Sequence, residues 1–272
     1  MEAVLYLIPV SLGDTDFSKV LPAYNRKVIL SLRSFIVENR RSARRFLKKI
    51  EPSIVIDNLN FYELNEQTTT EAITCLLLPM EKGESIGLMS EAGCPAVADP
   101  GAAVVALAQR KGYRVRSLVG PSSLLLALMA SGLNGQRFAF HGYLPVDAIQ
   151  RAECIKALEA RMYAEDETQV FMETPYRNNR LLADIVRLCR PSTQLCIASE
   201  LTTEGETIKT LPVRVWAKNL PDLNKKPTIF LIGGTDAKQR DGFSSEKQRF
   251  FQHRETDSAQ RDRETQRYTE KK

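Results

Sequence analysis

Several glutamates stand at or near the ends of strand-like apolar runs, where a carboxylate could do acid–base chemistry. They are Glu38, Glu91, Glu173 and Glu200. A carboxylate held beside a reacting hydroxyl can accept its proton as a general base. Each of these acids could instead cap a helix or pair with an arginine, as Glu200 could with Arg177. Their chemistry therefore depends on which elements bring them together.

Two proline–glycine loops follow neighbouring strand-like runs. The first loop, residues 90–101, follows the apolar run 86–89, and the second, residues 120–123, follows the run 115–119. Residues 102–111 between them are predicted to form a helix, with Asp99 as its cap, Pro100 in its first turn and Gly112 at its end. A parallel strand–helix–strand unit is almost always right-handed, so both loops should fall on one edge of the sheet. We expect a ligand crevice there.

Small residues in the first loop indicate the kind of ligand. Ala92, Gly93, Ala96 and Ala98 permit close approach to the backbone. Neither Gly-x-Gly-x-x-Gly nor a phosphate-binding Gly-x-x-x-x-Gly-Lys-Ser/Thr occurs in the sequence. Recognition through the backbone, without a lysine, favours a neutral or zwitterionic ligand such as a nucleoside with a short side arm.

The composition is that of a globular protein. Of 272 residues, 43% are hydrophobic and 26% are charged, and this length favours two domains. No segment is long and apolar enough to span a bilayer, and we predict no membrane association. The start of the sequence lacks a basic leader with a cleavage site. A cytoplasmic location is therefore expected.

Cysteine and histidine usage argues against several kinds of site. The five cysteines contain no Cys-x-x-Cys pair and are odd in number, which predicts reduced thiols rather than a zinc site or a disulfide framework. The two histidines are His141 and His253, so a histidine-based triad or metal centre is not expected, and we predict no bound metal. His141 is expected to be packed or hydrogen-bonded.

Short apolar runs alternate with helical spacing, which predicts an α/β fold. We expect a doubly wound, mostly parallel sheet in an N-terminal domain, residues 1–132, and a mixed sheet in a C-terminal domain, residues 133–235. The charged tail 236–272 has ten basic and eight acidic side chains and is predicted to be disordered or a loosely held helix. The predicted strands are 4–8, 34–37, 86–89, 115–119, 168–172, 194–199, 207–212 and 228–232, and the predicted helices are 42–50, 76–83, 102–111, 123–132, 151–163 and 177–189.

A basic stripe follows the second predicted strand. Its six cations recur at three- and four-residue spacing, opposite the apolar side chains of the same helix. They are Arg40, Arg41, Arg44, Arg45, Lys48 and Lys49. The stripe could seat a phosphate backbone or be a solvated helix face.

Seven motifs, in order over residues 1 to about 234, resemble the tetrapyrrole methylase superfamily, and in particular its branch that methylates a ribose 2′-hydroxyl of small-subunit ribosomal RNA. The motifs are Pro9 after the first strand, 90–101, 120–123, 130–133, 138–145, 173–177 and 198–202, with Gly233-Gly234 closing the series. This resemblance implies an S-adenosylmethionine-dependent methyltransferase of two α/β domains, with the cofactor in the cleft between them and a homodimer as the assembly.

The resemblance also implies roles for individual residues. The cofactor is expected to contact Pro9, Gly93, Cys94, Pro95, Val97, Ser122, Ser123, Met172, Ala198 and Thr228. Removing the proton of a ribose hydroxyl requires a base, and Glu38 and Glu91 are the leading candidates. The substrate RNA is expected to contact Arg40, Arg41, Arg44, Arg45 and Arg177.

The cofactor-facing motifs match the family pattern better than the acceptor-facing ones. Where the RNA-ribose branch usually carries Glu-Asp-Thr-Arg and Pro-His-Arg, this chain has Glu38-Asn39-Arg40-Arg41 and Pro175-Tyr176-Arg177. Two alternatives therefore stay open: C-methylation of a tetrapyrrole macrocycle, and a non-catalytic sensor that binds S-adenosylmethionine. A macrocycle requires a wide apolar trough with a few cations, whereas RNA requires an extended cationic track.

Overall fold

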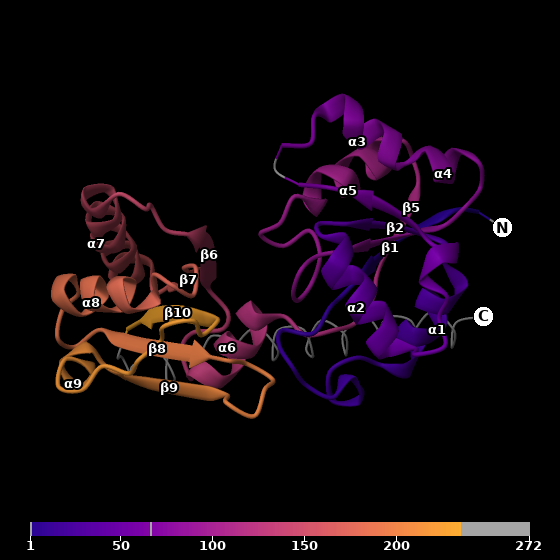
Figure 1. The fold of residues 1–272 in the computed structure, drawn as a ribbon. Helices are drawn as coiled ribbons and strands as arrows, with labels where there is room; N and C mark the ends of the chain where they lie inside the picture. Colours follow the sequence, from indigo (N-terminus) through magenta and orange to yellow (C-terminus); the bar gives the residue numbers. More distant parts are fainter. Residues whose placement is uncertain (1, 66, 235–272) are drawn as a thin grey trace, which may run out of the picture. The chain divides into compact units, whose positions relative to one another are not determined.

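The computed structural model describes residues 2–65 and 67–234. Strands in these residues form two sheets, a parallel one from the first half of the chain and a mixed one from the second half (Figure 1). The predicted α/β class, with one parallel and one mixed sheet, is confirmed. The predicted tail 236–272 lies outside the described residues, and the domain boundary at 132/133 stays a prediction.

The first sheet is parallel throughout, in the order β3-β2-β4-β1-β5. Its strands are β1 (Val4–Ile8), β2 (Ser34–Val37), β3 (Asn60–Glu63), β4 (Ile86–Met89) and β5 (Arg114–Ser117). Every residue of the inner strands β2 and β4 is buried, which is why they occur as continuous apolar runs. The edge strand β5 instead exposes Arg114 and Arg116, which discourages further strand pairing.

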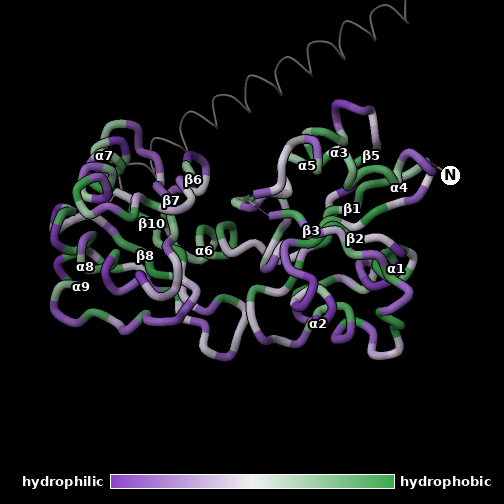
Figure 2. Tube along the Cα trace, turned by 45° about the horizontal axis from the view of Figure 1, so that its top comes forward, coloured by the Kyte–Doolittle hydropathy of each residue, from purple (hydrophilic) through white to green (hydrophobic). Residues whose placement is uncertain are grey.

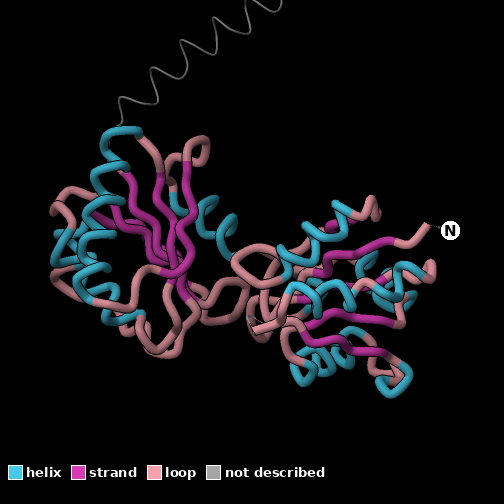
Figure 3. The backbone as a smooth tube through the Cα atoms, turned by 90° about the horizontal axis from the view of Figure 1, so that it is seen from above, coloured by secondary structure: helices cyan, strands magenta, loops and turns pink. Residues whose placement is uncertain are grey.

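Helices cover both faces of this sheet, as Figure 3 shows. They are η1 (Phe17–Lys19), α1 (Ala23–Ser31), α2 (Arg40–Ile50), η2 (Ile56–Asn58), α3 (Thr70–Leu76), α4 (Leu78–Glu81) and α5 (Gly101–Arg110). Successive side chains of a strand point to opposite faces. Phe35 and Val37 therefore pack with α1 and α2, whereas Ile36 packs with α3, α4 and α5. The sheet is doubly wound, as expected.

The second sheet has the order β6-β7-β10-β8-β9, with β6 and β7 parallel and the other pairs antiparallel. Its strands are β6 (Phe138–Tyr143), β7 (Thr168–Met172), β8 (Gln194–Ser199), β9 (Thr207–Pro212) and β10 (Thr228–Gly233). Helices α7 (Ala148–Glu165), α8 (Asn178–Leu188) and α9 (Val213–Trp216) pack on one face, around Phe171 and Phe230.

Helix α6 (Ser123–Ser131) covers the other face of the second sheet. Ala127 and Leu128 pack against strands β7, β8 and β10, and the Thr210 hydroxyl donates to the Ser131 carbonyl oxygen at 2.7 Å. Leu12, from the loop after β1, packs against the same cluster. This helix therefore joins the loop after β5 directly to the second sheet.

Strand bounds follow the sequence prediction more closely than helix bounds do. Strands β2, β4, β7, β8 and β9 have the predicted limits. Helix α2 begins at Arg40 rather than at 42, because the Asn39 side chain accepts hydrogen bonds from the N–H groups of Arg41 and Ser42. Strand β5 ends at Ser117 rather than at 119. The prediction does not include helix α1 or the edge strands β3 and β6, and it begins the helical segment of α3 and α4 at 76 rather than at 70. Helix α1 and strand β3 mix polar with apolar residues.

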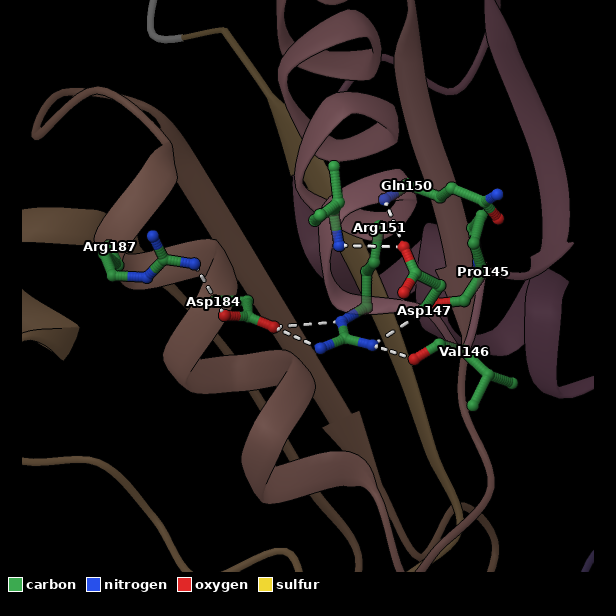
Figure 4. A network of polar contacts seen from close by, with 8 residues as sticks. Pro145, Val146, Asp147, Gln150, Arg151, Asp184 and Arg187 are labelled. Carbon is green, nitrogen blue, oxygen red and sulfur yellow. Dashed lines mark hydrogen bonds and ion pairs between the residues drawn. The ribbon is translucent and has the colours of Figure 1, made fainter.

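A buried guanidinium fixes the segment that follows β6. Arg151, whose side chain is 3% exposed, donates to Asp184 Oδ2 at 2.7 and 2.9 Å and to the carbonyl oxygen of Val146 at 2.7 Å (Figure 4). Asp147 caps α7 in the same network. Charge-assisted bonds of this kind are stronger than neutral ones, so Arg151 ties α7, α8 and the end of the β6 segment together.

The distribution of hydrophobic residues follows the arrangement of strands and helices around each of the two sheets. Hydrophobic residues gather along the strands, and hydrophilic ones gather on helices such as α2 (Figure 2). No helix in residues 2–65 and 67–234 is long and apolar enough to cross a membrane.

Gly120 offers a test of how tightly the loops after β1 and β5 pack. A Cβ atom at Gly120 would lie 2.3 Å from Pro9 Cγ and 2.4 Å from Pro9 Cβ, and the proline ring cannot turn away. We expect Gly120→Ala to lower the free energy of unfolding by about 1–3 kcal/mol, as overpacking does. Urea unfolding measures this loss.

Gly135→Ala is the matched control, because a Cβ atom at Gly135 meets nothing within 4 Å. The control is expected to change the free energy of unfolding by less than about 0.5 kcal/mol. Equal stability of the two variants would contradict the tight packing of Gly120 on Pro9.

Candidate active site

The two proline–glycine loops meet at one edge of the first sheet. Strands β4 and β5 flank β1 and run parallel to it, so their carboxyl ends open to the same side. The Cys94 thiol of the first loop donates to the Pro121 carbonyl oxygen of the second loop at 3.4 Å. The predicted approach of these loops is thus present in the structure.

A cavity of about 320 Å³ opens at this edge, within the size range of small-molecule sites. It is lined by residues from the loops of the first sheet and from the strand ends of the second. The lining residues are Leu12, Glu38, Ser90, Glu91, Ala92, Gly93, Cys94, Val97, Ala98, Asp99, Ser122, Ser123, Leu124, Phe140, Tyr143, Met172, Glu173, Pro175, Ala198, Leu201, Pro227, Thr228 and Ile229.

Most of the predicted cofactor residues line this pocket. They are Gly93, Cys94, Val97, Ser122, Ser123, Met172, Ala198 and Thr228. Pro9 and Pro95 are buried and are not among the lining residues; Pro9 lies against Gly120 instead. The structure therefore gathers eight of the ten positions around one cavity, and their contact with a cofactor stays a prediction.

Backbone strain shapes the first loop. Ala96 and Ala98 have positive φ angles of 67° and 60°, a conformation that costs roughly 1–3 kcal/mol at a residue with a Cβ atom. The Asp99 carboxylate holds the turn by accepting hydrogen bonds from the N–H groups of Ala96 at 2.9 Å and Gly101 at 2.7 Å. Gly93 is tied by two backbone hydrogen bonds to Val10 after β1. The loop is therefore preformed.

The second loop leads directly into α6. Ser122 caps this helix by accepting a hydrogen bond from the Leu125 N–H group at 3.5 Å. Ser122, Ser123 and Leu124 consequently sit at the first turn of α6, facing the pocket. The helix positions both predicted serines.

Both candidate bases line the pocket, and Glu38 has a strongly shifted proton affinity. Burial, reinforced by the negative charges of Asp99 and Glu91, raises the pKa of Glu38 to about 7, although the Glu91 N–H group donates to its carboxylate. Glu91 accepts a hydrogen bond from the Ser42 hydroxyl of α2 at 2.5 Å. A carboxyl group that titrates near neutral pH is suited to accept a proton during a reaction.

Glu173 has a different environment. Burial alone would raise the pKa of this carboxyl, but hydrogen bonds from Arg177 and the Thr174 N–H group, with the guanidinium charge, lower it below the usual value. The ion pair joins Arg177 Nη2 to Glu173 Oε1 at 2.7 Å. Glu200 pairs with Lys226 at 3.3 Å, so of the alternatives left open for Glu200 the structure does not show the pairing with Arg177. Glu173 is buried and lies four residues before Arg177, so it is the carboxylate that pairs with Arg177 in place of Glu200.

The basic residues of α2 lie outside the pocket, on a helix that begins two residues after Glu38. Arg40 pairs with Glu63 at 3.3 Å, and Arg44 lies 5.7 Å from the centre of the Phe61 ring. Arg41 and Arg45 are exposed and have no ion-pair or hydrogen-bond partner through their guanidinium groups within the described residues. These two side chains remain available to a ligand.

Lys48 and Lys49, at the end of the stripe, are also engaged. Lys49 pairs with Asp14 at 2.7 Å, and Lys48 donates to the Pro52 carbonyl oxygen at 3.0 Å. The stripe is therefore partly neutralised. His141, expected to be packed or hydrogen-bonded, lies 2.7 Å through Nε2 from Gln169 Oε1 and is not a pocket residue.

Sequence reasoning missed part of the site. Asp99 was interpreted only as a helix cap, yet its charge also faces Glu38. Phe140 and Tyr143 complete the pocket wall from β6, and the only signal for them was their place in the motif 138–145. No group of three or more His, Cys, Asp or Glu side chains in the described part of the chain could hold a metal ion.

Comparisons with known proteins agree with this arrangement. The family model of the tetrapyrrole (corrin/porphyrin) methylases matches residues 24–215. The chain is 33% identical over 187 residues to "Ribosomal RNA small subunit methyltransferase I" of Escherichia coli O157:H7, a match that covers 68% of this chain and 64% of the relative. The protein of the same name from Vibrio cholerae serotype O1 is 29% identical, covering 85% of this chain and 77% of the relative.

Solved structures share the fold. The methyltransferase CobJ superposes with a TM-score of 0.59 at 16% identity, covering 86% of this chain and 95% of that chain. Diphthine synthase superposes with a TM-score of 0.61 at 17% identity, covering 85% and 90% respectively. At these identities the likeness concerns the fold alone. The matching part of this chain spans less than two thirds of the Escherichia coli relative.

Proposed function

Because this chain belongs to the tetrapyrrole (corrin/porphyrin) methylases, we propose that it transfers a methyl group from S-adenosylmethionine to a ribose 2′-hydroxyl of ribosomal RNA. One observation carries the proposal. Glu38, with its pKa near 7, lines the pocket, and the helix that begins two residues later presents the basic stripe. The names of the relatives from Escherichia coli and Vibrio cholerae support RNA as the acceptor.

The pocket fits a nucleoside-based methyl donor. Its volume of about 320 Å³ and its small side chains at Ala92, Gly93 and Ala98 leave backbone groups accessible. The residues proposed to hold the donor are Gly93, Cys94, Val97, Ser122, Ser123, Met172, Ala198 and Thr228, with Pro9 and Pro95 supporting the loops from behind. When bound, the donor supplies a methyl group on a positively charged sulfur, which an oxygen nucleophile can displace in line.

Glu38 is proposed as the general base for this reaction. Its carboxylate would accept the proton of the ribose hydroxyl while the pocket aligns the acceptor oxygen with the methyl carbon and excludes water. Glu91 is the second candidate, and its carboxylate is oriented by the Ser42 hydroxyl. Proton removal by a positioned carboxylate contributes typically about 10²–10⁴-fold to a rate.

The RNA backbone is proposed to run along α2. Arg41 and Arg45 are exposed and unpaired among the described residues, so they would contact phosphates most directly. Arg40 and Arg44 would contribute with part of their charge already engaged by Glu63 and Phe61. Arg177, with its guanidinium paired to Glu173 beside the pocket, would contact the substrate nearer the reacting group. A homodimer and a cytoplasmic location remain part of the proposal.

C-methylation of a tetrapyrrole is the second candidate, favoured by the family as a whole. The charge of the pocket argues against it. Four acidic side chains and no lysine, arginine or histidine line the cavity within the described residues. A macrocycle with carboxylate arms requires cations in its trough, so RNA remains the better-supported acceptor.

Methyl transfer to RNA tests the proposal. Incubation with methyl-labelled S-adenosylmethionine and total cellular RNA should place the label in small-subunit ribosomal RNA, on a ribose oxygen. Glu38→Gln should reduce the rate by about 10²–10⁴-fold, because the base is removed. Glu153→Gln, an exposed substitution on α7, is the matched control and should keep the rate. Label recovered on a tetrapyrrole, or donor binding with transfer to no acceptor, would contradict the proposal and favour one of the alternatives.

Charge reversal on α2 tests the RNA surface. The double variant Arg41→Glu/Arg45→Glu should weaken RNA binding and lower the salt slope by about one for each phosphate that is no longer neutralised. Titration of labelled RNA at several salt concentrations measures both quantities. Lys156→Glu/Arg180→Glu, two exposed sites on α7 and α8, reverses the same charge elsewhere. If RNA binding weakens equally in both double variants, only the net charge of the chain affects binding, and the proposed RNA surface on α2 is contradicted.

A further inference from the structure

The pocket carries uncompensated negative charge. Of its four acidic side chains, Glu173 has a cationic partner in Arg177. Glu38, Glu91 and Asp99 have no ion pair within the described residues. They accept hydrogen bonds from a hydroxyl group and from backbone N–H groups, which do not cancel a charge. The cavity is therefore built to favour a positively charged occupant.

The three unpaired carboxylates come from two segments, the end of β2 and the loop 90–101, and are held in place. Glu38 follows β2, Glu91 follows β4 and is oriented by Ser42, and Asp99 is fixed by N–H groups that include the one at the start of α5. The other titratable groups of the cavity are Cys94, Tyr143 and the paired Glu173. The nearest cation along the chain, Arg40, is engaged by Glu63. Glu38 is thus faced by two acids of the loop 90–101, Glu91 and Asp99.

A methyl donor changes the charge of this site during the reaction. S-adenosylmethionine carries a positive sulfur, and the product S-adenosylhomocysteine carries a neutral one. In a partly buried site, a cation next to a carboxyl group favours its ionised form, whereas a neutral ligand does not. Burial and, after it, the charges of Asp99 and Glu91 already oppose ionisation of Glu38 and raise its pKa to about 7 before a ligand binds.

We propose that the positive charge of the methyl donor converts Glu38 to its ionised form, so that donor binding releases a proton from Glu38 to solvent. The neutral product does not favour ionisation, so Glu38 can keep the proton that it takes from the acceptor. This inference rests on the proposed function.

The chemical step conserves atoms and charge. The Glu38 carboxylate takes the hydroxyl proton, the acceptor oxygen forms its bond to the methyl carbon, and the electron pair of the carbon–sulfur bond passes to sulfur. The site loses one positive and one negative charge together and ends with a neutral Glu38 and a neutral thioether. Glu38 then returns its proton to water, because its pKa in the empty pocket is about 7.

Donor affinity should therefore depend on pH. The donor binds the ionised form of Glu38 more tightly, so its affinity rises with pH across the interval around 7 and levels off above it. If the donor lowers the pKa of Glu38 by about one unit, its affinity rises roughly fivefold between about pH 6 and pH 8. The affinity of the neutral product should stay nearly constant over the same interval.

Calorimetric proton counting tests the inference. S-adenosylmethionine and S-adenosylhomocysteine are titrated into the full chain near pH 6.5, in two buffers with different heats of ionisation. We expect about half a proton released per donor bound, for a shift of about one pKa unit, and none per product bound. In Glu38→Gln, the half proton assigned to Glu38 should disappear, and any release that remains reports titration of the ligand's own amino group.

Each outcome bears on a separate claim. Donor binding without proton release, equal release with the product, or undiminished release in Glu38→Gln would overturn the inference and leave the proposed function intact. If neither ligand binds, both the inference and the proposed function are overturned. If Glu38→Gln does not fold, the difference between donor and product in the unsubstituted chain still decides the matter.

Discussion

The parallel pairing of β4 and β5 on either side of β1 is the constraint on which the site depends. Because the three strands run in the same direction, the loops that follow them open at one edge of the sheet. Hydrogen bonds between Val10 and Gly93 and the contact of Cys94 with Pro121 then close these loops on one another. The left-handed turns at Ala96 and Ala98 are tolerated because the Asp99 carboxylate satisfies the surrounding N–H groups.

Opposite charges meet at the end of β2. Glu38 faces the acidic pocket, and the helix that Asn39 caps carries only cations among its charged residues. A single short segment therefore separates an interior that favours a positive ligand from a surface that favours a polyanion. This separation is consistent with a donor and an acceptor that approach from different sides and meet at Glu38.

The sequence predicted the strands that are buried on both faces well and several of the more exposed elements poorly. Strands such as β2 and β4 are buried on both faces, so an apolar run between turn signals marks their limits. Edge strand β3 and helix α1 lack such a pattern because one side of each faces solvent or polar neighbours. The start of α2 was placed two residues late because the Asn39 cap was not recognised.

The candidate site was predicted in its parts but not in its electrostatics. The resemblance to the family implied ten cofactor positions, and eight of them line the pocket together with Glu38 and Glu91. The shifted pKa of Glu38 depends first on its burial and then on the approach of Asp99 from a loop about sixty residues away, and no local pattern reveals either. The pairing of Arg177 with Glu173 instead of Glu200 is local by contrast, because the two residues lie four positions apart, and this spacing is a signal that the sequence carries.

The loops after β4 and β5 line one pocket. The proposal that this pocket binds the methyl donor is tested most directly by a crystal structure of the chain with S-adenosylhomocysteine. We predict the ligand in the cavity between the loop 93–98 and Ser122–Ser123, with its sulfur on the side of Glu38. A ligand bound at any other place on the chain, or facing away from Glu38 within the cavity, would contradict this prediction.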